Sequence, residues 1–324
     1  MKAIVRRNFG GPEMLQLEDV PMPVLAPGTV LIQVRAFGLN HAELYMRRGE
    51  WGNVAAISGI ECVGSVVADA TRRLPAGQTV MAMMGGMGRT INGSYAEYTL
   101  VPASNVIPVD TSLEWDALAA LPEAYAVAWT CLHRNLHLKP GQRLVVRGGT
   151  SSLGQAAIDI AAQLGAEVIA TTRNAGRAPL LASLGASHVV VADDGLAPAL
   201  ERIGGKVDAV LDLVGNSTIL DSLAATRRGG HVCLAGFLGG LAPMLDFNPL
   251  SQMPGGVQLS FFGSFSFGSE EFPLSDIPMQ QIVDMAANGR LRGRPARVFP
   301  FTELAAGHAL MEGNAANGKL VVVI

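Results

Sequence analysis

The chain has 324 residues, which suits two domains, and 49% of them are hydrophobic, enough for a large core. Only 16% are charged, below the roughly 25% usual for soluble domains, so we expect packing or a partner subunit to cover part of the surface. The net charge of −3, with basic residues in pairs at most, argues against a nucleic-acid partner and an anionic membrane surface. No apolar run reaches a membrane span, and the first residues do not resemble a signal peptide. Three dispersed cysteines are typical of the reducing cytoplasm, where we expect the protein to be located.

The first third of the sequence has the pattern of short β-strands. Runs rich in β-branched residues alternate with glycine, proline and asparagine, and they predict strands at 2–7, 15–20, 29–40, 61–69, 78–84 and 94–102. Many short strands with close turns indicate a β-barrel or a folded-over sheet. The glycine-rich segment 85–93 is either a mobile loop or an ordinary hairpin connection, and the sequence leaves both open.

From Ser112 the pattern changes to helices and strands in alternation. Helical spacing over 112–138 is interrupted at Pro122. Strands are then expected at 143–148, 167–173, 188–193, 207–215, 231–236 and 257–264, and helices at 151–166, 178–186, 196–205 and 218–230. These strands are apolar at successive positions, as in sheets covered on both faces, so we predict an α/β fold with a doubly wound parallel sheet. The tail adds a helix at 277–291, a strand at 296–301, a helix at 301–313 and a last strand at 319–324.

The stretch VVRGGTSSLGQAA, residues 145–157, is similar to a dinucleotide-binding turn with serine at the middle glycine position. We expect Gly149 to make the tight turn and Gly154 to allow close packing of helix on strand. Ser151 is small, and its hydroxyl could donate to a phosphate oxygen. A plain strand–helix turn is the alternative, but the position after the first parallel strand favours a phosphate site. The expected cofactor contacts in this turn are Thr150, Ser151, Ser152, Leu153 and Gly154.

The second strand of this run predicts which dinucleotide binds. An NAD site carries a carboxylate about 20 residues beyond the glycine turn, but none occurs between residues 168 and 192. Thr172 offers a hydroxyl there, and Arg173 and Arg177 offer guanidinium groups that could bind a 2′-phosphate. The alternative for both arginines is a solvated surface position. The pattern therefore predicts NADP as the cofactor.

Segments along the whole chain resemble the medium-chain dehydrogenase/reductase superfamily, specifically its zinc-free, zeta-crystallin-like quinone oxidoreductase branch. The segments are GLNHAELYMRRG, SGIECVGSV, NGSYAEY, VRGGTSSLGQAA and GKLVVVI, in the family's order. The resemblance implies a GroES-like domain from residues 1–118 and 268–324 and a Rossmann domain at 119–267. It also implies a cofactor cleft between the two and a homodimer formed through the edge strand near Val257–Ser264.

The resemblance also implies functional residues. Asn40 and Tyr45 would line the nicotinamide and substrate pocket, and the Tyr45 hydroxyl could orient a substrate oxygen or deliver a proton through water. Packing alone is the alternative for Tyr45. His41 stands at a family proline, and Val127 replaces a threonine near the nicotinamide, which weakens any inference about substrate. Further cofactor contacts would be Val214, Gly215, Gly236, Phe237, Phe262, Gly263 and Asn317.

The sequence predicts no metal site. Ile60 stands where the zinc-dependent relatives have a ligating histidine, and the three cysteines cannot form a four-cysteine lobe. His133 and His137 have helical i, i+4 spacing, but no third ligand is near them in sequence. Without a Lewis acid, the resemblance favours NADPH-dependent reduction of a quinone or an α,β-unsaturated carbonyl over alcohol oxidation.

Two other functions stay open at this point. One is a dinucleotide-binding protein with little catalysis, in a structural or regulatory role. The other is an enoyl-CoA-type reductase, whose basic entrance could use Arg47, Arg48 and Arg89.

Zinc independence is directly testable, because a chain without zinc ligands neither binds zinc tightly nor loses activity when zinc is removed. We expect purified protein to contain no stoichiometric zinc and its turnover to survive dialysis against a chelator. Elemental analysis and activity before and after dialysis measure this. One tightly bound zinc per chain that is required for turnover would contradict the prediction.

Overall fold

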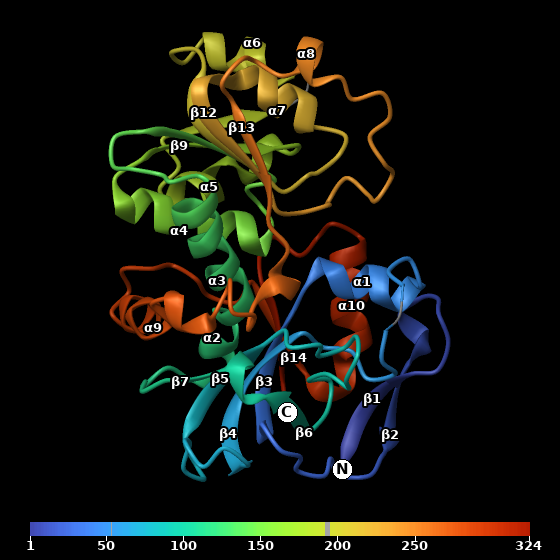
Figure 1. Cartoon of the computed structure of the whole chain (residues 1–324). Helices are drawn as coiled ribbons and strands as arrows, with labels where there is room; N and C mark the ends of the chain where they lie inside the picture. Colours follow the sequence, from blue (N-terminus) through green and yellow to red (C-terminus); the bar gives the residue numbers. More distant parts are fainter. Residues whose placement is uncertain (53, 192–194) are drawn as a thin grey trace. The chain divides into compact units, whose positions relative to one another are not determined.

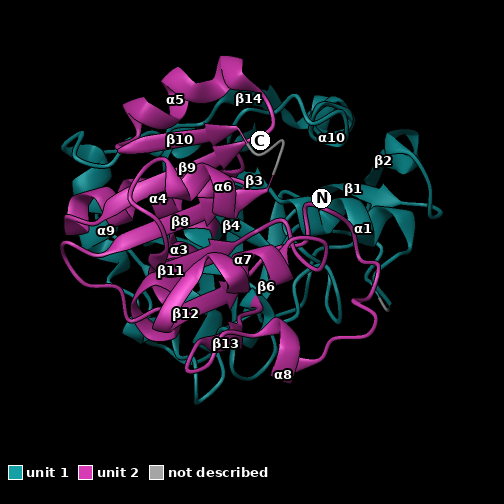
Figure 2. Ribbon diagram, turned by 90° about the horizontal axis from the view of Figure 1, so that it is seen from above, with its two compact units in different colours: residues 1–123, 264–324 teal, residues 124–263 magenta. Residues whose placement is uncertain are grey.

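The computed structural model describes residues 1–52, 54–191 and 195–324 (Figure 1), and the chain forms two compact units. Unit 1 consists of residues 1–123 and 264–324, and unit 2 of residues 124–263 (Figure 2). The boundaries lie five and four residues from the expected ones. They differ because α2 (Trp115–Ala119) packs on strands of unit 1, so the chain enters unit 2 only within α3 (Pro122–Thr130).

Unit 2 contains a parallel sheet whose strands have the 3-2-1-4-5-6 order of dinucleotide-binding domains. All neighbouring strands are parallel, and Figure 2 shows them side by side. The order is β10 (His188–Val191), β9 (Glu167–Thr172), β8 (Arg143–Arg147), β11 (Val207–Asp212), β12 (Thr226–Leu234) and β13 (Gln258–Phe261). The strand order reverses between β8 and β11, and open α/β sheets bind their ligands outside the strand ends at such a point.

Helices of unit 2 pack their apolar sides onto this sheet. Leu196 and Leu200 of α6 (Leu196–Glu201) and Leu223 of α7 (Ile219–Ala225) pack with strand residues such as Val145 and Val210. Full burial of each such side chain contributes about 1.5–3 kcal/mol. The other helices of the unit are α4 (Ser152–Leu164), α5 (Ala178–Ser183) and α8 (Pro249–Gln252), and α4 contacts β8 and β9.

Two details of unit 2 differ from expectation, and a third lies outside the described residues. The helix expected over 218–230 ends at Ala225, because the chain from Thr226 pairs with β11 as the start of β12. Helix α3 runs into a π-helical turn at Cys131–Asn135, so His137 lies beyond it, with a φ of +49°, and does not share a helical face with His133. The last two positions of the strand expected at 188–193 lie outside the described residues.

Unit 1 is built on an antiparallel sheet to which both ends of the chain contribute. Its order is β14 (Arg297–Pro300), β15 (Leu320–Val323), β3 (Thr29–Leu39), β4 (Glu61–Asp69), β5 (Thr79–Met83) and β7 (Val106–Pro108), with β6 (Tyr98–Pro102) also on β3. Among the strands described in unit 1, only β14 and β15 pair in parallel, and β1 (Lys2–Arg6) and β2 (Leu15–Asp19) form a separate hairpin (Figure 1). Its helices are α1 (His41–Arg48), α2, α9 (Met279–Ala287) and α10 (Leu304–Glu312).

Short 3₁₀ turns connect these elements. They lie at Pro12–Met14, Ala103–Asn105, Ala175–Arg177, Ser264–Ser266, Leu274–Asp276 and Phe301–Glu303. None of the helices in the described ranges has the length and apolar character needed to cross a membrane.

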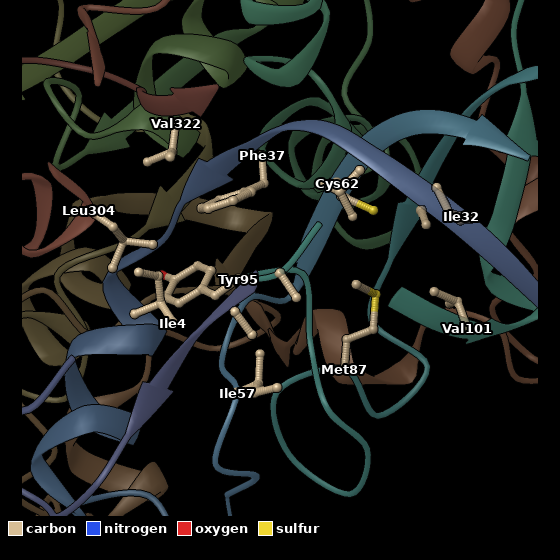
Figure 3. Packing of buried hydrophobic residues seen from close by; sticks show 14 of the residues in the cluster. Ile4, Ile32, Phe37, Ile57, Cys62, Met87, Tyr95, Val101, Leu304 and Val322 are labelled. Atoms are coloured by element: carbon tan, nitrogen blue, oxygen red, sulfur yellow. The ribbon is translucent and has the colours of Figure 1, made fainter. Parts of the chain in front are cut away.

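The core of unit 1 reaches into the glycine-rich segment 85–93 (Figure 3). The rings of Phe37 and Tyr95 stack with centroids 4.9 Å apart, and the Met87 side chain is buried in the same cluster. The carbonyl of Gly86 accepts from the amides of Arg89 and of the two residues that follow it. The segment is therefore a closed turn anchored by Met87, which favours the hairpin connection over a mobile loop.

A buried ion pair ties the last strand to β4. Lys319 Nζ donates to a carboxylate oxygen of Glu61 and, at 2.7 Å, to Asn40 Oδ1, and the side chains of Lys319 and Glu61 are 4% and 0% exposed. A Cβ on Gly38 would lie 2.1 Å from Lys319 Cε, so the lysine stem fits only because this position of β3 is glycine. The pair thus fixes the C-terminal strand beside β3 and β4.

Removal of this lysine tests how far unit 1 depends on the pair. Lys319→Met should lower the free energy of unfolding by about 3–5 kcal/mol, because it leaves the Glu61 charge buried without its partner. Lys2→Met is the matched control, since Lys2 pairs with Asp19 at side chains that are 49% and 77% exposed. The control should cost less than about 1 kcal/mol in urea unfolding. Equal losses in the two variants would contradict the assignment.

Candidate functional site

The chain turns from β8 into α4 through four small residues. Gly148 has a φ of +79°, so the left-handed turn lies there and not at Gly149 as expected from the sequence. A Cβ on Gly154 would lie 2.4 Å from the carbonyl oxygen of Gly148, so this position needs glycine for close packing of the helix on the strand. The backbone of the turn therefore has the geometry expected of a dinucleotide-binding turn, shifted by one glycine.

Ser151 has a different role from the one expected. Its Oγ accepts from the Gly154 amide at 3.0 Å and donates to the Gly148 carbonyl at 2.8 Å, as the N-cap of α4. The single hydroxyl proton is thereby used inside the turn and does not point to a phosphate. Ser152 and Leu153 begin the helix, and their amides have no carbonyl one turn earlier within it. These two amides are the donors that the helix offers to an anion.

The end of β9 lies against the glycine turn. The amide of Gly149 donates to the Thr171 carbonyl at 3.1 Å. The Thr172 hydroxyl closes its own turn with the backbone of Asn174, so it is not a free donor for a ribose. Arg173 is exposed, and no acidic side chain pairs with it within the described ranges.

The second arginine expected at this edge makes a contact with the glycine turn. Arg177 Nη1 lies 3.5 Å from Thr150 Oγ1, the outer limit of a hydrogen bond. A cation therefore lies at the turn that would hold the phosphates.

A buried carboxylate that the sequence analysis missed shapes the loop after β11. Asp212 is fully buried, and its Oδ1 accepts from the amides of Val214 at 2.9 Å and Gly215 at 3.0 Å. The hydroxyls of Thr218 and Ser222 donate to the same carboxylate. An acidic residue that ends an apolar strand was the available signal, because buried aspartates occur where donors surround them.

The ends of β11 and β12 meet beside this loop. A Cβ on Gly215, whose φ is +108°, would lie 3.0 Å from the Gly236 carbonyl and 3.2 Å from the ring of Phe237. The structure therefore brings these expected contacts together. Phe262 and Gly263 follow β13 and do not lie within it as expected.

One expected cofactor contact lies in the other unit. Asn317, with a φ of +55°, precedes β15 in unit 1.

In unit 1, the two expected pocket residues are both nearly buried. Asn40 Nδ2 donates to Glu61 Oε1 at 2.8 Å, and Asn40 Oδ1 accepts from Lys319. The ring of Tyr45 lies edge-on to His41, with centroids 5.1 Å apart, and its centroid is 6.1 Å from that of Trp51. Burial raises the pKa of Tyr45.

A series of buried hydrogen bonds from Glu43 through Tyr95 to His308 supports α1. Glu43 accepts from the amides of Asn40 at 2.8 Å and Ile60 at 3.0 Å and from the Tyr95 hydroxyl at 2.7 Å. Burial nevertheless raises the pKa of Glu43 to about 7. The Tyr95 oxygen is also 2.9 Å from His308 Nε2, and burial lowers the pKa of His308 to about 3. This neutral histidine and Glu43 belong to the support of Asn40, a role that only the fold reveals.

The residues present do not fit a zinc site. Ile60 is a buried apolar side chain, and the three cysteines are buried and form no disulfide. His133 Nδ1 is 2.9 Å from the Trp129 carbonyl, and the ring of His137 packs on His231. Across the described part of the chain, no group of three histidine, cysteine, aspartate or glutamate side chains could hold a metal ion.

Two family models match this chain. Residues 26–111 match the alcohol dehydrogenase GroES-like domain, and residues 152–279 match the zinc-binding dehydrogenase model. The chain belongs to the medium-chain dehydrogenase/reductase superfamily. The expected combination of a GroES-like domain with a Rossmann domain is thus confirmed.

Relatives of known name place this dehydrogenase/reductase in the quinone oxidoreductase branch. The chain is 25% identical over 334 residues to the quinone oxidoreductase of Homo sapiens, covering all of this chain and 98% of that protein. It is 26% identical over 335 residues to the 2-haloacrylate reductase of Burkholderia sp, with the same coverage.

Solved structures of other proteins share the fold of this chain over its full length. A mycobacterial protein in complex with NADPH is 25% identical, with a TM-score of 0.87 over the full length of both chains. An NAD-dependent alcohol dehydrogenase, also 25% identical, has a TM-score of 0.85 over the same coverage.

The Asp212 carboxylate offers a test of the strand-end site. Asp212→Asn replaces one acceptor oxygen by a donor, so at least one bond that shapes the loop is lost. NADPH affinity should fall by about 5- to 50-fold, since a hydrogen bond to a charged group is worth roughly 1.5–3 kcal/mol. Fluorescence titration with NADPH measures it.

The matched control lies at the other end of the same strand. Asp208 is the second residue of β11 and accepts from the Arg143 amide at 2.7 Å. Asp208→Asn should leave NADPH affinity unchanged. Equal effects of the two substitutions would show that the carboxyl end of the strand is not the binding edge.

Proposed function

We propose that this chain is an NADPH-dependent, metal-independent reductase of quinones or α,β-unsaturated carbonyl compounds. The observation that carries the proposal is the carboxyl edge of the unit 2 sheet. There a glycine turn, two helix-opening amides and Arg173 lie at the ends of adjoining strands, and residues 173–191 offer no carboxylate for a ribose 2′-hydroxyl. The names of the quinone oxidoreductase and 2-haloacrylate reductase relatives support the reaction class.

The residues fit a dinucleotide in a definite way. The amides of Ser152 and Leu153 would hold the pyrophosphate, and Arg173 and Arg177 the 2′-phosphate. Ser151 and Thr172, whose hydroxyls are bonded within their own turns, would contribute packing alone. The remaining contacts would be Thr150, Gly154, Val214, Gly215, Gly236, Phe237, Phe262, Gly263 and Asn317. The NADPH complex of the mycobacterial neighbour supports this choice, whereas the NAD-dependent neighbour makes the cofactor a property to be measured.

When bound, NADPH would supply a hydride and water a proton. An α,β-unsaturated carbonyl compound would take them at its β- and α-carbons and become saturated, a quinone would become a hydroquinone, and NADP⁺ would remain in both cases. Conjugated acceptors suit a site without a Lewis acid, because the negative charge that develops is delocalised in the acceptor itself. Asn40 would hold the start of α1 in place, since the two ends of its side-chain amide are bonded to Glu61 and Lys319. Tyr45 would contact the acceptor from α1 and orient its oxygen.

The alternatives are less well supported. An enoyl-CoA-type reductase would need a basic entrance, but Arg47 and Arg48 both bind Glu312. A dinucleotide-binding protein with little catalysis would show cofactor affinity without turnover of any acceptor. A panel assay of NADPH oxidation with quinones, enones, enals and an enoyl-CoA separates these functions.

We also propose a homodimer formed through β13. This strand lies at the edge of the unit 2 sheet and exposes Leu259 and Phe261. An edge strand with exposed apolar side chains invites pairing with another strand. The three cysteines, which form no disulfide, suit the cytoplasmic location that we propose with it.

Arg173 decides the cofactor in this proposal. Arg173→Ala should weaken NADPH binding by about 10- to 100-fold and leave NADH binding unchanged, because only the 2′-phosphate loses a charge-assisted bond. Calorimetric titration with both cofactors measures it. Arg202→Ala, an exposed arginine after α6 in the same unit, is the matched control and should change neither affinity. An NADH preference of the unmutated protein would contradict the assignment.

A further inference from the structure

Three arginines could give the substrate region of unit 1 a positive charge, and the structure separates them. The side chain of Arg47 is fully buried, and its Nη2 lies 2.7 Å from Glu312 Oε2. Arg48 binds the other oxygen of Glu312 through Nη2 at 2.6 Å and Nε at 2.9 Å, and it lies 3.9 Å from Glu50. Both guanidinium groups therefore have acidic partners, Glu312 for the two of them and Glu50 beside Arg48.

Arg89 is different. Its guanidinium carbon lies 5.6 Å from the centroid of the Trp51 ring, and no carboxylate pairs with it among the residues that the structure describes. A cation over a tryptophan face is held in place by the ring, while the N–H groups at its edge stay available to an acceptor. The Trp51 ring is in turn a neighbour of Tyr45.

The backbone under Arg89 is well defined. Its amide donates to the Gly86 carbonyl at 2.9 Å, and Met87 anchors the turn in the core of unit 1 (Figure 3). A Cβ on Gly88 would lie 3.3 Å from the amide nitrogen of Gly59, so the turn packs tightly on the chain just before Ile60. Arg89 is thus placed at a fixed distance from the aromatic side chains that follow Asn40.

We propose that Arg89 binds the carboxylate of an anionic acceptor, which makes the substrates small α,β-unsaturated carbonyl compounds that carry a carboxylate. The inference rests on the proposed function for the reduction step, which follows the hydride and proton balance given above. A guanidinium fork recognises a carboxylate through two parallel hydrogen bonds, which a neutral quinone cannot reproduce. One unpaired arginine matches one carboxylate, whereas a CoA thioester carries several phosphate charges.

The kinetic test compares two acceptors that differ only in charge. 4-Oxo-2-pentenoate carries a carboxylate, and 4-oxo-2-pentenamide replaces it by a neutral amide of the same shape. Arg89→Gln should raise KM for the acid by about 10- to 100-fold and leave KM for the amide within about twofold, because one charge-assisted contact is lost. Arg89→Lys should fall between, since the charge stays and the fork is lost.

Arg72→Gln is the matched control, because Arg72 is an exposed arginine of the same unit after β4 and its loss changes the net charge equally. It should leave both KM values unchanged. Equal changes for acid and amide in Arg89→Gln, or none for either, would overturn the proposal.

A binding measurement separates this proposal from the reductase assignment. Calorimetry with 4-oxopentanoate and 4-oxopentanamide requires neither turnover nor cofactor. We expect the unmutated protein to bind the acid at least about tenfold more tightly than the amide, and Arg89→Gln to bind both equally. Selective acid binding without any turnover would overturn the reductase function and leave the carboxylate site standing. Turnover without acid selectivity in either measurement would do the reverse.

Discussion

The contact on which unit 1 depends is the buried cluster of Lys319, Glu61 and Asn40. Its three side chains come from the turn before β15, the start of β4 and the start of α1, which are far apart in sequence. A buried lysine and a buried glutamate are each costly alone, so the cluster is stable only when all these elements are in place. It therefore couples the C-terminal strand to the segment that presents His41 and Tyr45.

The same cluster explains the role of Asn40, which fixes the start of α1 through its side-chain amide. Its donor and its acceptor are both used within the cluster, and its backbone amide donates to Glu43. Glu43 in turn is held by Tyr95, which contacts the neutral His308. These buried hydrogen bonds favour one orientation of α1, because rotation of the helix would break several of them.

In unit 2, side chains shape the loops at the carboxyl ends of the parallel strands, so that backbone amides there stay available to a ligand. Ser151 and Asp212 both use their side chains to shape loops, one as the cap of α4 and one as the acceptor of four donors after β11. Neither side chain needs to meet a ligand to affect binding. The donors left for an anion are helix-opening amides and arginines, which suits the phosphates of a dinucleotide.

The sequence determined most of the elements and their order, because hydrophobic periodicity and glycine or proline punctuation are local signals. The strands of the parallel sheet, the glycine turn with its tight packing at Gly154, and the missing zinc ligand at Ile60 were all readable. It also determined the family, since several segments match in order along the chain. Arg173 was readable as a cofactor determinant, and its role stays a prediction.

Only the tertiary structure decided which polar side chains bond to other parts of the protein and are therefore not available to a ligand. The bonds of Ser151 to Gly148, of Asp212 to the loop after β11, and of Arg47 to Glu312 depend on where the backbone turns and which elements pack together. The exchange of helix for strand at Thr226 has the same origin, because pairing with β11 outweighs the local helical pattern. Availability of a polar group is set by contacts between residues distant in sequence, and periodicity carries no information about them.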